Sequence, residues 1–151
     1  MHYSNRFCLI QENHQKYLLT SNSLLYLLNP TFVLDKNPEI NLNDDFKHIQ
    51  NEFKKNVPSL VLCSNAFHKI EFLDKLIFSI KNPIIFVDMD LLYSGYIESK
   101  MIKEKENLEI FRPNKLDWKE KLSEIICKIS EKEFFIIIDS FNGIYNLFDD
   151  F

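Results

Sequence analysis

The stretch that most constrains the fold is residues 134–138, a run of large apolar side chains that leads into Asp139 and Ser140. A short apolar run, rich in Ile and Phe and bounded by polar residues, predicts a strand that is buried on both faces. Strands of this kind occur in parallel sheets covered by helices. A carboxylate at the carboxyl end of such a strand lies where open α/β sheets bind their ligands.

Similar apolar runs recur earlier in the chain, separated by segments with helical periodicity. The runs are Ser59–Cys63, Ile84–Asp88 and Leu108–Phe111, and the helical segments cover residues 66–80, part of 91–106 and 117–130. This alternation is typical of parallel β-α-β units. The sequence therefore predicts an α/β fold with three α/β/α layers around a mainly parallel sheet. Right-handed crossovers then bring Ser64, Asp88 and Asp139 to one edge.

The helix expected at 117–130 has two predicted details. Asp117 and Glu120 have the spacing of a capping box at its start. Its apolar stripe is expected to face the core and consists of Trp118, Leu122, Ile125, Ile126 and Ile129.

The first third of the chain has weaker periodicity. Strands are expected at 7–11 and 31–34 and a helix at 44–55. Two alternatives stay open between the strands, a hairpin partner at 16–20 and a short helix at 24–28. We expect one domain over residues 1–151, with strands and a helix in 1–57 and an α/β core in 58–151.

Composition excludes several classes of protein. The net charge of −4 argues against broad nucleic-acid or anionic-membrane binding. The absence of a signal peptide or a long apolar run favours a cytoplasmic protein without a membrane segment. Cys8, Cys63 and Cys127 each lie in an apolar context, which predicts buried, reduced thiols.

The segment after the strand Ser59–Cys63 has the place of a phosphate-binding loop. In a P-loop, G-x-x-x-x-G-K-[S/T] joins a strand to a helix. Here residues 63–70 read Cys-Ser-Asn-Ala-Phe-His-Lys-Ile, so Lys69 takes the lysine position. Ser64, Asn65 and Lys69 are the candidate phosphate contacts. A lysine one turn into a helix is also an ordinary feature of an exposed helix surface.

The order of these elements resembles the RecA-like ATPase core shared by archaeal recombinases and KaiC-type proteins. The matching segments are residues 60–69, 83–90 and 134–140, and Phe-Asn-Gly-Ile follows at 141–144. The resemblance covers residues 57–148 and implies an incomplete RecA-like P-loop NTPase architecture. Since the family normally continues with further strands, we expect either a fragment or a sheet completed by a partner.

The resemblance also implies roles for individual residues. Asp139, at the end of its strand, would hold magnesium, and Asp88 or Asp90 would help to activate the attacking water. Lys69 would contact the phosphates, so ATP and magnesium are the implied cofactors. Alternatively, Asp139 only caps a turn at 140–143.

Departures from the P-loop pattern at the glycine positions and at the hydroxyl position weaken the implied activity. Both P-loop glycines are absent, although glycine lets the backbone approach a phosphate closely. His68 stands in place of the second glycine. Ile70 replaces the hydroxyl residue and cannot ligate a hard cation, which prefers oxygen.

A different resemblance comes from residues 86–92, Phe-Val-Asp-Met-Asp-Leu-Leu. An apolar strand followed by D-x-D resembles the nucleophile motif of haloacid-dehalogenase-like phosphatases, with Asp88 as nucleophile and Asp90 as acid/base.

The leading hypothesis is a non-catalytic or weakly nucleotide-binding RecA-like relative. It would act through a protein partner or a homo-oligomer, in DNA recombination and repair or in KaiC-like regulation. The alternatives are a magnesium-dependent ATPase using Lys69 and Asp139, and a phosphatase using Asp88 and Asp90.

Overall fold

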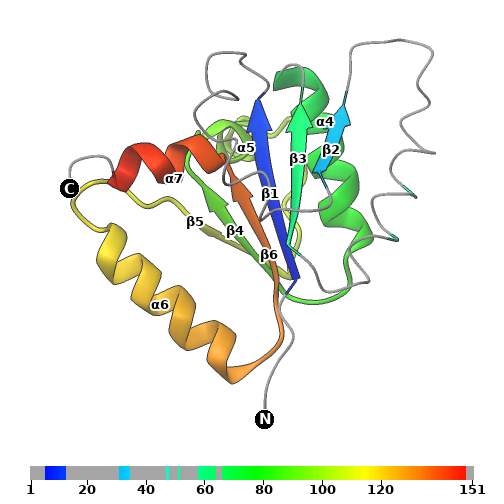
Figure 1. Ribbon diagram of the computed structural model, residues 1–151. Coiled ribbons are helices and arrows are strands. Elements are labelled where there is room, and N and C mark those ends of the chain that lie inside the picture. Colours follow the sequence, from blue (N-terminus) through cyan, green and yellow to red (C-terminus); the bar gives the residue numbers. More distant parts are fainter. Residues whose placement is uncertain are drawn as a thin grey trace.

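The computed structural model describes residues 6–12, 31–34, 47, 51, 58–63 and 66–148. They contain a six-stranded parallel sheet in the order β2-β3-β1-β6-β4-β5 (Figure 1). The strands are β1 (Arg6–Glu12), β2 (Thr31–Leu34), β3 (Ser59–Cys63), β4 (Ile84–Asp88), β5 (Leu108–Phe111) and β6 (Phe135–Asp139). The helices are α4 (Ala66–Ser79), α5 (Leu92–Glu98), α6 (Trp118–Glu131) and α7 (Phe141–Phe148). The predicted α/β fold with a mainly parallel sheet is confirmed.

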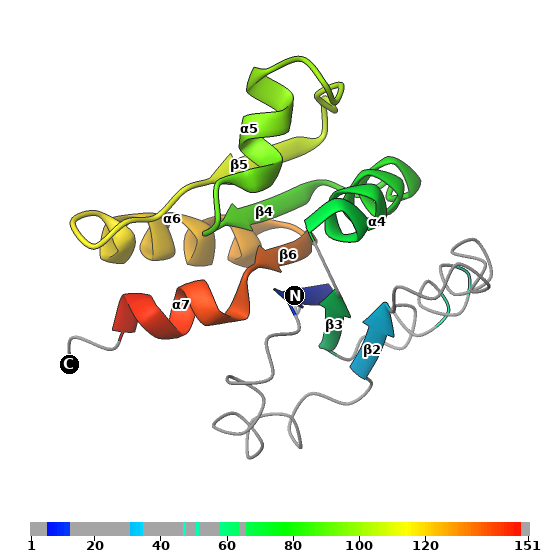
Figure 2. The ribbon, with the colours of Figure 1, turned by 90° about the horizontal axis from the view of Figure 1, so that it is seen from above.

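The two faces of the sheet carry separate cores, because successive strand residues point to opposite faces. Phe86 and Ile137 belong to a core with residues of α4 and α5. Ile85 and Ile136 belong to a second core with Ile125 of α6. Figure 2 accordingly shows α4 and α5 on one side of the sheet and α6 and α7 on the other.

Helix α4 forms because its apolar residues recur with helical spacing and cover the first of these faces. Five of its apolar side chains are buried, those of Ile70, Phe72, Leu73, Leu76 and Ile77. At the carboxyl end of α4, Lys105 Nζ donates hydrogen bonds to the carbonyl oxygens of Ile77, at 2.6 Å, and of Ile80. This cation satisfies carbonyl groups that the end of a helix leaves without partners.

Helix α6 departs from its prediction in two ways. The Asp117 side chain makes no capping bond to the helix; its Oδ1 instead accepts a hydrogen bond from the Asn114 backbone N–H at 2.9 Å. The predicted capping box is therefore wrong. In the expected core stripe only Ile125 is buried, whereas Leu122 and Ile126 are exposed.

The segments around α5 and α7 also differ from expectation. The helix expected within 91–106 is confined to Leu92–Glu98, and Lys100 just after it has a left-handed φ of 59°. The predicted turn at 140–143 is the first turn of α7. Ser140 Oγ accepts a hydrogen bond there from the Gly143 backbone N–H at 3.1 Å, in the manner of an N-cap residue.

The N-terminal strand β1 lies inside the sheet, between β3 and β6. Both neighbours are parallel to it, and they come from the part of the chain after Pro58. The residues expected at 16–20 and 24–28 lie outside the described residues. So does the helix expected at 44–55, apart from Lys47 and Asn51, which are helical.

Two of the three thiols have described side chains, and they differ. Cys63 is a buried free thiol, as predicted, whereas Cys127 is exposed on α6, so the prediction of a buried thiol is wrong there. Within the described residues, no helix is long and apolar enough to cross a membrane.

Candidate functional site

The candidate site lies at the carboxyl edge of the sheet, where β4 and β6 end side by side. Asp88 and Asp139 are the last residues of these strands and stand opposite each other in the register. Both side chains are fully buried. Parallel pairing of the two strands therefore places two carboxylates at one point of the edge, as the sequence predicted.

Lys69 enters this site from the first turn of α4. Its side chain has an exposed fraction of 0%, so the prediction of an exposed helix lysine is wrong. Lys69 Nζ donates a hydrogen bond to Asp90 Oδ2 at 3.2 Å and lies 3.2 Å from Asp139 Oδ1. A buried ammonium group needs compensating charges, because burial without them is costly. Asp90 and Asp139 supply these charges.

Asp139 is the less well satisfied of the two partners. It contacts Lys69 as an ion pair, but within the described residues neither of its carboxylate oxygens accepts a well-aligned hydrogen bond. Burial raises the pKa of Asp139 to about 7, with the nearby charge of Asp90 adding to the rise and that of Lys69 opposing it. This carboxyl group therefore changes charge near neutral pH.

Asp90 is the more accessible carboxylate, with a side-chain exposed fraction of 34%. Its Oδ1 accepts a hydrogen bond from Ser140 Oγ at 3.1 Å, while its Oδ2 faces Lys69. The following residue, Leu91, has a left-handed φ of 59°, a conformation that is unfavourable for a side chain of this size. Asp90 is thus held on a strained turn between β4 and α5.

Asp88 faces a different set of groups. Its Oδ2 accepts hydrogen bonds from the Ser94 backbone N–H, at 2.9 Å, and from Ser94 Oγ. Arg112 Nε, just beyond β5, donates to the same hydroxyl oxygen at 2.9 Å. Asp88 therefore anchors the first turn of α5 and is not directed towards solvent.

The structure thus brings together most of the predicted site residues. Lys69, Asp90 and Asp139 form one cluster, named here the lysine cluster, and Asp88 lies beside it. Ser64 and Asn65 lie outside the described residues.

Sequence reasoning missed Ser94 and Arg112 as members of this site. Each follows a strand of the same parallel sheet, Ser94 six residues after Asp88 and Arg112 directly after β5. A search for polar residues just beyond each strand could have found them, because these positions share one edge.

The described residues do not fit magnesium triphosphate well. A phosphate that reached Lys69 would compete with two carboxylates for one ammonium group. In the part of the chain that the structure describes, no three His, Cys, Asp or Glu side chains are grouped so as to hold a metal ion. Such a cation prefers several oxygen ligands.

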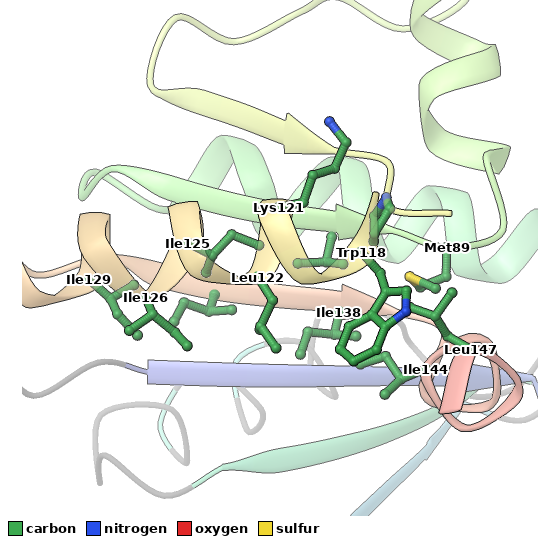
Figure 3. Close-up of a pocket in the computed structure, with 13 residues that line it drawn as sticks. Met89, Trp118, Lys121, Leu122, Ile125, Ile126, Ile129, Ile138, Ile144 and Leu147 are labelled. Carbon is green, nitrogen blue, oxygen red and sulfur yellow. The ribbon is translucent and has the colours of Figure 1, made fainter. Parts of the chain in front are cut away.

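A second feature lies on the face of the sheet that α6 and α7 cover, between these two helices and the strands. It is an apolar pocket of about 220 Å³ (Figure 3). We name it the α6–α7 pocket; its lining residues are Val87, Met89, Pro113, Trp118, Lys121, Leu122, Ile125, Ile126, Ile129, Ile136, Ile138, Ile144 and Leu147. The exposed residues Leu122 and Ile126 are among them, which explains why the predicted core stripe of α6 is not fully buried.

Comparison of the chain with protein-family models, curated proteins and solved structures gave no match.

Proposed function

We propose that this chain is a RecA-like ATPase relative that does not hydrolyse ATP, binds nucleotide weakly at most and acts through contacts with other proteins. The family assignment rests on the order of the sequence motifs. A cytoplasmic location and a role beside recombination, repair or KaiC-like proteins are part of the same proposal.

The observation that carries the proposal is the position of Lys69. Its ammonium group is buried and lies 3.2 Å from each of two carboxylates. At an effective dielectric constant of about 20, each contact of this length contributes roughly 5 kcal/mol of Coulomb attraction before desolvation is counted. A bound phosphate would have to replace part of this attraction, and the missing P-loop glycines remove the backbone donors that normally help.

The experiment is a titration of a fluorescent ATP analogue, with and without magnesium, together with a phosphate-release assay. We expect no saturable binding of the nucleotide below about 1 mM, which corresponds to a binding free energy of roughly −4 kcal/mol. We also expect no phosphate release above the rate in buffer alone. Saturable micromolar binding with turnover would overturn the proposal.

Protein contacts are supported by the α6–α7 pocket. Exposed apolar residues that are gathered around a concave site often mark a surface that binds another molecule. Exposed apolar residues that are scattered singly do so less often. Leu122 and Ile126 line this pocket and are exposed. Sedimentation of the wild type and of Leu122→Glu/Ile126→Glu tests for self-association through this surface.

A magnesium-dependent ATPase is the second candidate, and one observation favours it. Lys69 Nζ lies 3.2 Å from Oδ1 of the buried Asp139, but Oδ2 has no hydrogen-bond donor among the described residues, and a hard cation is a suitable partner for such an oxygen. In this case magnesium would raise nucleotide affinity at least tenfold. Asp139→Asn would abolish that increase, whereas Glu71→Gln, which removes a carboxylate from the exposed side of α4, would preserve it.

The phosphatase alternative receives less support from the geometry. Its nucleophile would be Asp88, whose side chain is fully buried and bonded to Ser94. A nucleophilic carboxylate must reach the phosphorus atom of a substrate.

A further inference from the structure

Asp90 is the member of the lysine cluster that solvent reaches. The side chains of Lys69 and Asp139 have exposed fractions of 0%, whereas that of Asp90 is 34% exposed. Ser140, which bonds to Asp90, is also buried. An anion that approaches Lys69 from solvent on the side of Asp90 therefore meets the Asp90 carboxylate first.

The contacts of Asp90 are those that a bound oxyanion would make. One carboxylate oxygen accepts from the Lys69 ammonium group at 3.2 Å and the other from the Ser140 hydroxyl at 3.1 Å. A phosphate group is recognised by the same kinds of donor, a cation and a hydroxyl. The Asp90 carboxylate thus fills the position that an external oxyanion would need.

The attachment of Asp90 allows it to leave this position without disturbing the core. Asp90 lies on the turn before α5, its side chain is partly exposed, and its neighbour Leu91 is exposed with a left-handed φ. The start of α5 is held separately, by the hydrogen bonds from Ser94 to Asp88. The strain at Leu91 favours rearrangement of this turn when the Asp90 contacts are lost.

We propose that Asp90 is an internal latch over a phosphate-type oxyanion site formed by Lys69 and Ser140. With the latch closed, the carboxylate keeps the anion out; with it open, the same two donors bind an oxyanion of a phosphate or a nucleotide. This inference rests on the proposed function, in which Lys69 is retained on a chain that does not hydrolyse ATP. The site then senses an anion without turning it over.

The test compares the wild type with Asp90→Ala and with Asp90→Asn, which preserves the size of the side chain. Inorganic pyrophosphate and ATP are titrated separately, without magnesium. We expect both variants to bind pyrophosphate at least tenfold more tightly than the wild type, and Lys69→Met in either background to abolish the gain. An equal gain for pyrophosphate and ATP identifies phosphate as the ligand, and a larger gain for ATP identifies a nucleotide.

A matched control and a second measurement accompany this titration. Glu71→Gln removes one carboxylate from the same helix as Lys69, where Glu71 pairs with Lys75 at 3.4 Å, and is expected to produce no gain. Mass spectrometry of chemical acetylation measures access to Lys69 directly. Its modification rate is expected to rise at least tenfold in the Asp90 variants and to fall when pyrophosphate is added.

The outcomes separate the latch from the proposed function. Unchanged pyrophosphate affinity and unchanged Lys69 acetylation in both Asp90 variants would overturn the latch while leaving the proposed function intact. ATP turnover by the wild type would overturn the proposed function itself. Tight pyrophosphate binding by the wild type would overturn the latch, because it would show that a closed latch does not exclude anions.

Discussion

At the scale of single residues, the lysine cluster is a buried set of charges that must remain balanced. Replacing Lys69 with methionine leaves Asp139 buried without its cation. We expect a loss of about 1–3 kcal/mol in the free energy of unfolding, below the roughly 3–5 kcal/mol of other buried pairs that lose one partner, because Asp139, whose pKa is already about 7, takes up a proton when its cation is removed. Urea denaturation of Lys69→Met measures this loss.

A lysine on the same helix provides the comparison. Lys75 pairs with Glu71 at 3.4 Å, and both side chains are more than one third exposed. Lys75→Met is therefore expected to cost only about 0–1 kcal/mol. Adding Asp139→Asn to Lys69→Met is expected to recover part of the larger loss, because it removes the buried carboxyl group that has lost its cation. Equal effects of Lys69→Met and Lys75→Met would contradict the observed burial.

The charge of Asp139 predicts how stability depends on pH. Its pKa rises from 3.8 to about 7 on folding, so between these values the folded state binds more protons than the unfolded state. The contribution of Asp139 to the free energy of unfolding is therefore complete below pH 4. It is lost as the pH rises through 7, by at most about 1.4 kcal/mol per pH unit.

Asp139→Asn removes this titration, so the variant is expected to gain stability relative to the wild type as the pH rises from about 4 to about 7, and the difference is expected to level off above pH 7. Urea denaturation in buffers free of divalent cations measures the difference at each pH. A difference that stays constant over this range would show that Asp139 has an ordinary pKa.

At the scale of secondary-structure elements, the two glycines are expected to respond in opposite ways to alanine. A Cβ atom on Gly95, in α5, would meet nothing within 4 Å. A Cβ atom on Gly143, in α7, would collide with Cβ of Met89. Gly95→Ala is therefore expected to stabilise by about 0.5–1 kcal/mol, and Gly143→Ala to destabilise by about 1–3 kcal/mol.

Thermal denaturation of both variants checks this pair, each serving as the control for the other. Destabilisation by Gly95→Ala would contradict the open surroundings of α5. Unchanged stability of Gly143→Ala would show that α7 does not pack closely on the loop after β4.

The elements themselves were largely predictable from the sequence. Strands β3, β4 and β5 and helix α4 follow from apolar periodicity, which reports burial directly. The capping box at Asp117 failed because Asn114 offers a competing backbone N–H to the same side chain. The burial of α6 was also misjudged, since periodicity identifies an apolar stripe but not whether another element covers it.

The candidate site was predictable in its position but not in its contacts. Strand ends marked Asp88 and Asp139, because parallel strands end at one edge. The pairing of Lys69 with Asp90, and of Asp88 with Ser94, depends on side-chain directions across that edge. These follow from the turn after β4, where Leu91 takes a left-handed conformation that its residue type does not favour.

At the scale of the whole molecule, the α6–α7 pocket leaves one face open. A solvatochromic apolar dye is expected to bind there with increased fluorescence, because a pocket of about 220 Å³ exceeds the roughly 150 Å³ cavity known to take benzene. Leu122→Glu/Ile126→Glu is expected to remove at least half of this signal.

The control is Leu116→Glu, since Leu116 has an exposed fraction of 98% and does not line the pocket. An equal loss of signal in this variant would assign the dye to scattered surface residues. The dye titration is independent of nucleotide, so it tests the contact surface separately from the lysine cluster.

The central place of β1 in the sheet also bears on how the protein is made. Arg6 of β1 pairs with Phe135 of β6, so two strands that are far apart in the sequence lie side by side in the sheet. A nascent chain on the ribosome cannot join the two halves of the sheet until β6 has been synthesised. Until then β1 has one edge without its final partner, a state that favours slow closure and invites chaperones or aggregation.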